Sequence, residues 1–180
     1  MYAEEAFHAA ILLYYAVVNH YVFYGINNAH RLLGRPLDDA LVNRMLSGSP
    51  TYYTGWNLAI QELYFILRMV EHLLKFLSIA SSERLRRWTR MILSVFVAPG
   101  SCAVVFMFWS VYAVSPGLVY GDFLDDINPV WVNHAIHTNV ALIALLELYL
   151  RAQSDDIWNG GFVRGALTFA AFLIFYTITS

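Results

Sequence analysis

The sequence contains little charge and almost no cysteine. Only 13% of its 180 residues are Asp, Glu, Lys or Arg, whereas residues of the types AVILMFWYC make up 59%. Average soluble domains have roughly 25% charged and 45–50% apolar residues. A soluble fold of this length could not bury so much apolar surface, because the fraction of surface that folding buries is limited at this size. The composition therefore predicts that lipid surrounds much of the chain.

Several functional classes are excluded by what is missing. The single cysteine, Cys102, lies in an apolar run, which excludes a disulfide framework and a cysteine-based zinc site. The net charge is −2 and no Lys/Arg cluster alternates with aromatic residues, so we expect no nucleic-acid partner. The N-terminus has Glu4 and Glu5 but no Lys or Arg, and no small-residue cleavage pattern follows. We therefore expect the first apolar segment to be a retained helix and not a removed signal peptide.

Apolar runs of membrane-spanning length predict an all-α fold, a polytopic transmembrane helical bundle that forms one integral membrane domain over residues 1–180. About 20 mostly apolar residues are needed to cross ~30 Å of hydrocarbon. The third run contains Pro99-Gly100, which we expect to kink it. The last run is short, since its residues reach only ~24 Å, and we expect the sequence to be a fragment or a short isoform. The predicted spans cover about residues 7–26, 52–77, 91–114, 129–150 and 165–180.

The distribution of arginine predicts which loops face the cytoplasm. The loop Ser78–Arg90 has the densest positive cluster, whereas the loop Ser115–Asn128 has three aspartates and no Lys or Arg. This alternation puts the N-terminus inside, although three arginines in the first loop argue the other way. We expect a multi-pass protein of the endoplasmic reticulum, another endomembrane or the plasma membrane. The sequence does not distinguish these compartments, and it does not fix the oligomeric state.

The richest polar cluster opens the fourth apolar segment and contains Asn133, His134 and His137. Their spacing of three and four residues puts all three side chains on one face of a helix. Polar residues within a membrane usually face the interior of a bundle, which makes them candidates for a functional site. The alternative is that these residues lie at the membrane interface and only form hydrogen bonds with headgroups and neighbouring helices.

A second polar cluster opens the second segment, where Thr54, Asn57 and Gln61 fall on one stripe. Taken alone, a threonine at a helix start is more often an N-cap than a nucleophile. The predicted topology, however, puts Thr54 and His137 near the same leaflet. A threonine hydroxyl needs a neighbouring base to act as a nucleophile, and histidine is the usual one. Asn133 or Asn57 would then orient the imidazole or donate to an oxyanion.

A metal site is the competing interpretation of the same histidines. His134 and His137 are three residues apart and could chelate an ion from one helix face. The remaining candidate ligands are spread across the bilayer, which argues against a metal centre. We also expect Glu71 to form an ion pair with Lys75 four residues later. The other candidate metal ligands are Glu62, Glu71, His72 and Glu147.

An ordered set of motifs over roughly residues 50–150 resembles the androgen-induced, FAR-17a-like family of multi-pass membrane proteins. No single motif is decisive, but their order and spacing are specific. The motifs are Tyr53-Thr54-x-Trp56-Asn57-Leu58-x-Ile60-Gln61, Arg87-Trp88, Pro99, Phe108-Trp109-x-x-Tyr112, Leu118-Val119-Tyr120, Ile127-x-Pro129-x-Trp131-x-Asn133-His134-x-x-His137-Thr138 and Leu146-Glu147.

The resemblance implies a hydrolase that cleaves fatty acid esters of hydroxy fatty acids, lipids in which one acyl chain esterifies the hydroxyl of another. It also implies an intramembrane threonine nucleophile at Thr54 and a histidine partner at His137. Asn133, Asn57 and His134 are the candidates for orienting the imidazole or binding an oxyanion. We expect no metal or organic cofactor, and membrane lipids as the surroundings. Two alternatives stay open, a non-catalytic membrane regulatory protein and a histidine-dependent membrane metalloenzyme.

Overall fold

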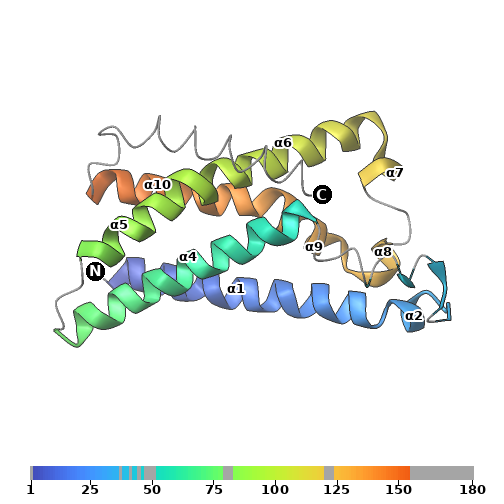
Figure 1. The fold of residues 1–180 in the computed structure, drawn as a ribbon, viewed down its shortest axis with the longest axis horizontal. Coiled ribbons are helices and arrows are strands. Elements are labelled where there is room, and N and C mark those ends of the chain that lie inside the picture. The colour runs from blue at the N-terminus through green and yellow to red at the C-terminus, as the bar shows by residue number, and fades with distance from the viewer. Residues whose placement is uncertain are drawn as a thin grey trace.

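A computed structural model describes residues 2–36, 38–40, 42, 43, 46, 52–78, 83–119 and 124–154. Within these ranges the chain folds into helices and contains no strand, so the all-α prediction is confirmed. The long helices lie side by side along the length of the molecule (Figure 1). α1 and α4 pack together, and α6 packs against α10.

Two of the long helical segments are interrupted by a π-helical turn. α5 (Glu83–Ile92) continues through η2 (Leu93–Val97) into α6 (Ala98–Val114). α9 (Val130–His134) continues through η3 (Ala135–Asn139) into α10 (Val140–Ser154). The other elements are α1 (Tyr2–Asn27), α2 (Ala29–Leu32), α4 (Tyr53–Phe76), α7 (Pro116–Val119) and α8 (Leu124–Ile127).

The first four predicted spans all fall on helices, but only part of the membrane prediction is supported. By length and composition, the helices Ala3–Asn27 and Arg84–Val114 could cross a membrane. Among the described residues, the segments that contain α4 and α10 do not meet the same combined criteria of length, hydropathy and charge, and both carry polar side chains. A five-span bundle is therefore not confirmed, and the predicted fifth span, 165–180, lies outside the described residues.

The predicted loop Ser78–Arg90 is wrong over most of its length. Residues 83–90 belong to α5 and continue directly into the third predicted span. A segment rich in arginine can be helical, since Arg has a high helix propensity and a long side chain that reaches water from a helix surface. The reversal between α4 and α5 includes Ser78, whose φ of 55° ends the regular helical backbone.

The start of α4 decides what role Thr54 can have. Tyr52 is extended, with φ −73° and ψ 127°, and its carbonyl accepts from the N–H groups of Gly55 and Trp56 at 3.0 and 3.3 Å. Tyr52 is therefore the N-cap residue, and Thr54 lies within the first helical turn. The N-cap interpretation of Thr54 is wrong for this reason.

Pro99 is the second residue of α6, which begins directly after the π-helical turn η2. Proline lacks an N–H group, and its ring disturbs the preceding helical turn. A wider turn beside it keeps the segment helical, and the surrounding helices bury Val97, Ala98 and Gly100. The kink at Pro99 stays a prediction, and the helix departs from regular α geometry in the turn before it, Leu93–Val97.

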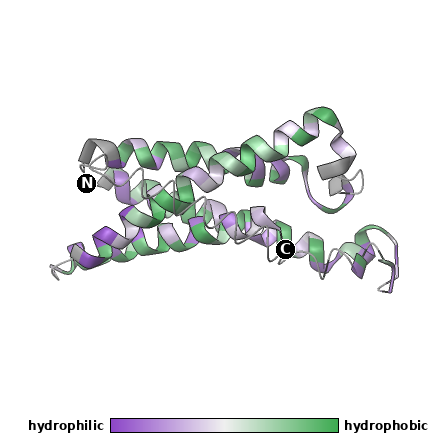
Figure 2. Ribbon diagram, turned by 45° about the horizontal axis from the view of Figure 1, so that its top comes forward, coloured by the Kyte–Doolittle hydropathy of each residue, from purple (hydrophilic) through white to green (hydrophobic). Residues whose placement is uncertain are grey.

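A polar side chain lies at the centre of the apolar core. The Gln61 amide nitrogen donates to Ser101 Oγ at 2.7 Å and to the Val140 carbonyl at 3.4 Å, while its oxygen accepts from the Tyr15 hydroxyl. One residue of α4 thus contacts α1, α6 and α10. Figure 2 shows hydrophobic residues over much of the length of the long helices. The buried apolar side chains around Gln61 include Tyr15, Val18, Tyr64, Phe65, Leu93, Val97, Val104, Val140 and Ala144.

Candidate functional site

The π-helical turn η3 carries His137. A π-helical turn holds one residue more than an α-helical turn, and such turns are frequent at functional sites. The imidazole of His137 stacks on the ring of Phe108 from α6, with centroids 3.6 Å apart and an interplanar angle of 11°. Phe108 is itself buried. The plane of the imidazole is therefore fixed by the neighbouring helix.

Asn133 fixes which nitrogen of His137 carries the proton. His137 Nδ1 lies 2.7 Å from Asn133 Oδ1 and 3.1 Å from the Asn133 backbone carbonyl oxygen. A backbone carbonyl can only accept, so Nδ1 is the protonated nitrogen that donates to it. In the neutral ring, Nε2 then has the free lone pair. This is the tautomer that a general base acting through Nε2 requires.

Thr54 is half-buried in the first turn of α4, and its hydroxyl forms no hydrogen bond within the described part of the chain. The structure therefore does not join Thr54 to His137 directly. The two residues lie on elements that pack together, since α4 and η3 are in contact. Figure 1 shows the start of α4 at the same end of the bundle as α9.

The contact between Gln61 and Val140 sets the register between α4 and α10, which run in the same direction. Thr54 precedes Gln61 by seven residues, or about 10 Å of helix, and His137 precedes Val140 by three, or about 5 Å. The two candidate residues therefore differ in height by about one helical turn. By the same measure Asn133 is about level with Thr54.

Asn57 lies one turn below Thr54 and has an unused donor. Its oxygen accepts from Ser101 Oγ at 3.5 Å, a long contact, and its amide nitrogen Nδ2 is buried without a hydrogen-bond partner. A buried unpaired donor is costly, and each one in a native structure calls for an explanation. A donor of this kind can stabilise an anion that develops close to Thr54.

His134 does not face the same surroundings as His137. It is exposed and stacks on Trp109, with centroids 5.4 Å apart, while Trp109 Nε1 donates to Thr138 Oγ1 at 3.1 Å. The two histidines thus contact different aromatic residues of α6. No carboxylate joins them in a group close enough to share a metal ion, within the ranges that the structure describes.

The expected partner of Glu71 is also different from the one observed. Glu71 accepts from Arg68 at 2.6 Å and lies 3.4 Å from Arg151 of α10, whereas no ion pair between Glu71 and Lys75 occurs in the described residues. Arg68 and Arg151 are both buried, so their charges must be compensated within the bundle. The exposed Lys75 is solvated instead.

A comparison with protein families identifies the chain. The model of the FAR-17a/AIG1-like protein family matches residues 4–179. The chain belongs to this family. The match includes the elements that carry Thr54, Asn57, Asn133 and His137, so the candidate site lies in the part of the chain that is characteristic of the family.

Curated relatives agree with this family assignment. The chain is 31% identical to the androgen-dependent TFPI-regulating protein of Rattus norvegicus, over 88% of this chain and 69% of the relative. It is also 31% identical to the protein of the same name from Mesocricetus auratus, over 77% of this chain and 59% of the relative. The human androgen-induced gene 1 protein is 31% identical over 56% of this chain and 46% of its own length. The chain thus spans about 60% of the hamster relative. No solved structure matches.

A second group of polar residues lies at the other end of the bundle, and the sequence analysis named His72 as a candidate metal ligand without grouping it with Glu4 and His8. Glu4, His8 and His72 each offer a ligand atom, and these atoms lie within 4.8 Å of one another. His8 and His72 are 64 positions apart, so no local spacing predicts that they meet. The only signal in the sequence is the presence of charged residues in segments that are otherwise apolar.

Proposed function

We propose that this chain is a multi-pass integral membrane hydrolase that cleaves fatty acid esters of hydroxy fatty acids, with Thr54 as nucleophile and His137 as base. The family assignment supports a membrane protein of the FAR-17a/AIG1-like family, and the hydrolase activity is our proposal. The observation that carries the chemistry is the hydrogen bond from His137 Nδ1 to the Asn133 carbonyl oxygen, because it leaves the Nε2 lone pair free. Thr54 is half-buried, lies at the same end of the bundle and belongs to the family motif that opens α4.

The reaction begins when His137 Nε2 accepts the proton of the Thr54 hydroxyl as its oxygen attacks the ester carbonyl. The oxyanion forms near Asn57, whose Nδ2 has an unused N–H to donate. When the ester C–O bond breaks, His137 returns the proton to the departing oxygen, and the hydroxy fatty acid leaves. The acyl group stays bound to Thr54 as an ester.

Water completes the cycle. His137 Nε2 removes a proton from a water molecule, and the resulting hydroxide attacks the acyl carbonyl. As the bond to Thr54 breaks, its oxygen takes the proton back and the second fatty acid is released. Throughout both steps Asn133 holds the Nδ1–H of His137, so only Nε2 exchanges protons. These steps need no metal or organic cofactor.

The nature of the site fits a lipid substrate. Phe108 and Trp109 provide apolar walls next to the two histidines of this segment. Exposed aromatic residues, including Trp56 and Trp131, lie close in sequence to Thr54 and Asn133. Such residues favour the boundary between hydrocarbon and water. An ester could therefore enter laterally while water enters from the membrane surface.

Labelling of the purified chain with a lipid-like serine/threonine hydrolase probe tests this proposal. We expect the wild type to be labelled, with the adduct on Thr54 by peptide mass spectrometry, and Thr54→Ala and His137→Gln to lose labelling. Ser94→Ala is the matched control, because this hydroxyl lies at the far end of the bundle and donates to the Arg90 carbonyl at 2.9 Å. Equal labelling of wild type and Thr54→Ala would rule out this nucleophile.

A non-catalytic regulatory role is the second candidate, and the name of the rodent relatives favours it, since they are described as TFPI-regulating proteins. A regulator that works only through binding retains its effect after Thr54→Ala and His137→Gln. Measuring the cellular effect of the chain together with its hydrolysis of a fatty acid ester of a hydroxy fatty acid separates the two functions.

A further inference from the structure

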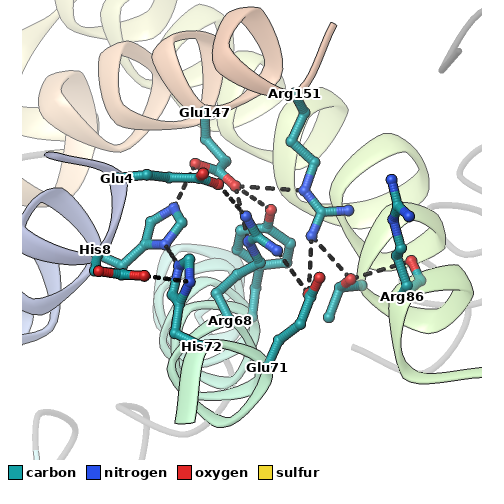
Figure 3. Close-up of polar contacts among 11 residues, drawn as sticks. Glu4, His8, Arg68, Glu71, His72, Arg86, Glu147 and Arg151 are labelled. Carbon is teal, nitrogen blue, oxygen red and sulfur yellow. Dashed lines mark hydrogen bonds and ion pairs between the residues drawn. The ribbon is translucent and has the colours of Figure 1, made fainter. Parts of the chain in front are cut away.

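A network of buried ionisable groups joins three helices at the end of the bundle opposite Thr54 (Figure 3). The N-terminal turns of α1 contribute Glu4 and His8, the last turns of α4 contribute His72, and α10 contributes Glu147. Burying charges is unfavourable unless they are paired or bind a metal. The arrangement of the two histidines distinguishes between these possibilities.

His8 is completely buried and is held from both sides. Its Nε2 lies 2.8 Å from Glu147 Oε2, and its Nδ1 lies 2.8 Å from His72 Nε2. The carboxylate accepts, so Nε2 of His8 is the nitrogen that carries the proton in the neutral ring. His8 Nδ1 therefore points a lone pair toward His72.

His72 has a similar but looser arrangement. Its Nε2 donates to His8 Nδ1 at 2.8 Å while no ion is bound, and its Nδ1 lies 3.8 Å from the carboxylate of Glu5, beyond hydrogen-bond distance. A cation between the two rings would replace this N–H···N bond, with the proton of His72 moved to Nδ1 on the side of Glu5. Histidines that bind a metal ion usually donate their second N–H to a carboxylate, which orients the ring and makes it a better ligand.

We propose that Zn²⁺ binds between His8 Nδ1 and His72 Nε2, with the carboxylate of Glu4 as a third ligand and water as a fourth. Glu147 and Glu5 are the outer carboxylates. Zinc–nitrogen distances of about 2.05 Å in a tetrahedral site separate two nitrogens by about 3.3 Å. The two nitrogens are 2.8 Å apart and the ring centroids 5.0 Å apart, so the rings face each other almost head-on. To admit the ion, the nitrogens must separate by about half an ångström and the rings must turn toward it.

Glu4 can serve as a ligand without losing its present partner. One of its oxygens accepts from Arg68, and a carboxylate has a second oxygen with free lone pairs. Its side chain is 42% exposed, which gives an ion a path from the surface. The ligand atoms of Glu4, His8 and His72 all lie within 4.8 Å of one another.

The charge of the surroundings also favours a cation. Carboxylates outnumber guanidinium groups in the network, so it carries an excess of negative charge while both histidines are neutral. A divalent cation neutralises this excess in an environment of low dielectric constant, where charge interactions are strong. Among the described residues, the ion pairs of this region involve the carboxylates Glu4, Glu5, Glu71 and Glu147 and the arginines Arg68 and Arg151.

The bound ion would connect helices that are far apart in the sequence. His8 belongs to α1 and His72 to α4, and Glu147 adds α10 through its bond to His8. A bound ion would therefore hold α1 and α4 together and would be linked through His8 to α10. The site lies at the other end of the bundle from His137 and does not depend on the proposed hydrolase activity.

Metal binding to the whole chain, purified in detergent without a histidine tag and stripped with a chelator, tests the proposal. On addition of ZnCl2 we expect about one zinc ion per chain by elemental analysis after desalting. Co²⁺ should give the visible absorption of a tetrahedral site. His72→Ala should weaken zinc binding at least a hundredfold, and Glu147→Gln about 10–100-fold, since it removes only an outer-shell partner.

His20→Ala is the matched control, because His20 is an exposed histidine of the same helix as His8. It should bind zinc as tightly as the wild type, and so should Thr54→Ala, which separates this site from the hydrolase proposal. A wild type that gives no tetrahedral Co²⁺ spectrum overturns the proposal, even where His72→Ala fails to fold. Equal zinc affinity of folded wild type and His72→Ala overturns it as well.

Discussion

The imidazole of His137 lies flat on the ring of Phe108, at a centroid distance of 3.6 Å. Together with the bond between His137 Nδ1 and Asn133, this contact fixes both the plane and the rotation of the ring. A base held in one orientation needs no reorganisation before it accepts a proton. Loss of either contact should therefore slow the reaction.

Phe108→Leu should lower the turnover of a fatty acid ester about tenfold, because the imidazole loses its stacking surface while most of the apolar volume stays. The hydrolysis rate at saturating substrate measures this effect. Phe106→Leu is the control, since Phe106 lies on the same helix with 74% of its surface exposed. Equal losses in the two variants would mean that the stacking contact has no role in orienting His137.

Asn133→Ala should reduce kcat by about 10–100-fold and leave KM nearly unchanged. The His137 ring would keep only the longer contact with the Asn133 backbone carbonyl at 3.1 Å. Asn139→Ala provides a comparison, because Asn139 belongs to the same π turn but donates to Tyr14 of α1 at 2.9 Å. A change in KM without a change in kcat would contradict an orienting role for Asn133.

Asn57→Ala should lower kcat about 10²–10³-fold, as expected for the loss of one donor to an oxyanion. Its effect on stability should be small, because Nδ2 has no partner to lose and the contact from Ser101 is long. Thermal unfolding and kinetics measured on the same preparation distinguish the two effects. Unchanged kcat in a folded variant would exclude Asn57 from the oxyanion site.

Gln61→Leu should destabilise the bundle by about 1–3 kcal/mol, since the buried Tyr15 hydroxyl would lose its acceptor. Tyr15→Phe removes the same bond from the other side. The double variant should lose less stability than the sum of the single variants, because neither partner is left unpaired. Denaturant unfolding of the four proteins measures this coupling, and strictly additive losses would mean that the bond contributes nothing.

Gly25→Ala should destabilise the protein by about 1–3 kcal/mol, because an added Cβ would lie 2.5 Å from Asn128 Oδ1 and 2.7 Å from Ile127 Cγ2. This contact outweighs the ~1 kcal/mol that alanine gains over glycine in a helix. Gly117→Ala is the matched control, since nothing lies within 4 Å of its added Cβ. Thermal unfolding in detergent compares the two, and equal stability would show that the loop before α9 adjusts freely.

The sequence predicted those parts of the fold that depend on local pattern. Apolar runs predicted the positions of α1, α4 and the continuous segment α9–η3–α10 to within a few residues, because a long apolar run in this chain is also a helix. Hydropathy failed to predict the helix α5, because a segment rich in arginine is polar whether it forms a helix or a loop. The predicted number of spans stays a prediction, since two helices of the described residues are long and apolar enough to cross a membrane.

One contact of the candidate site could be predicted from the sequence, and the others could not. The spacing of four residues between Asn133 and His137 predicts their hydrogen bond, because residues four apart are neighbours on one face of a helix. The same rule wrongly paired Glu71 with Lys75. Glu71 instead pairs with Arg68, three residues earlier, and with Arg151, 80 residues away. His8 meets His72 across 64 residues. Only the packing of helices determines such long-range pairs.

The π turn that carries His137 holds one residue more than a regular helix would need at this point. A single deletion within Ala135–Asn139 would leave a continuous apolar helix, and its insertion into a bilayer would look normal. If the deleted residue is Ala135 or Ile136, Asn133 also rotates by roughly 100° relative to His137, and their spacing of four residues is lost. Relatives or splice forms that differ by one residue in this turn would therefore keep the membrane protein but lose the aligned base.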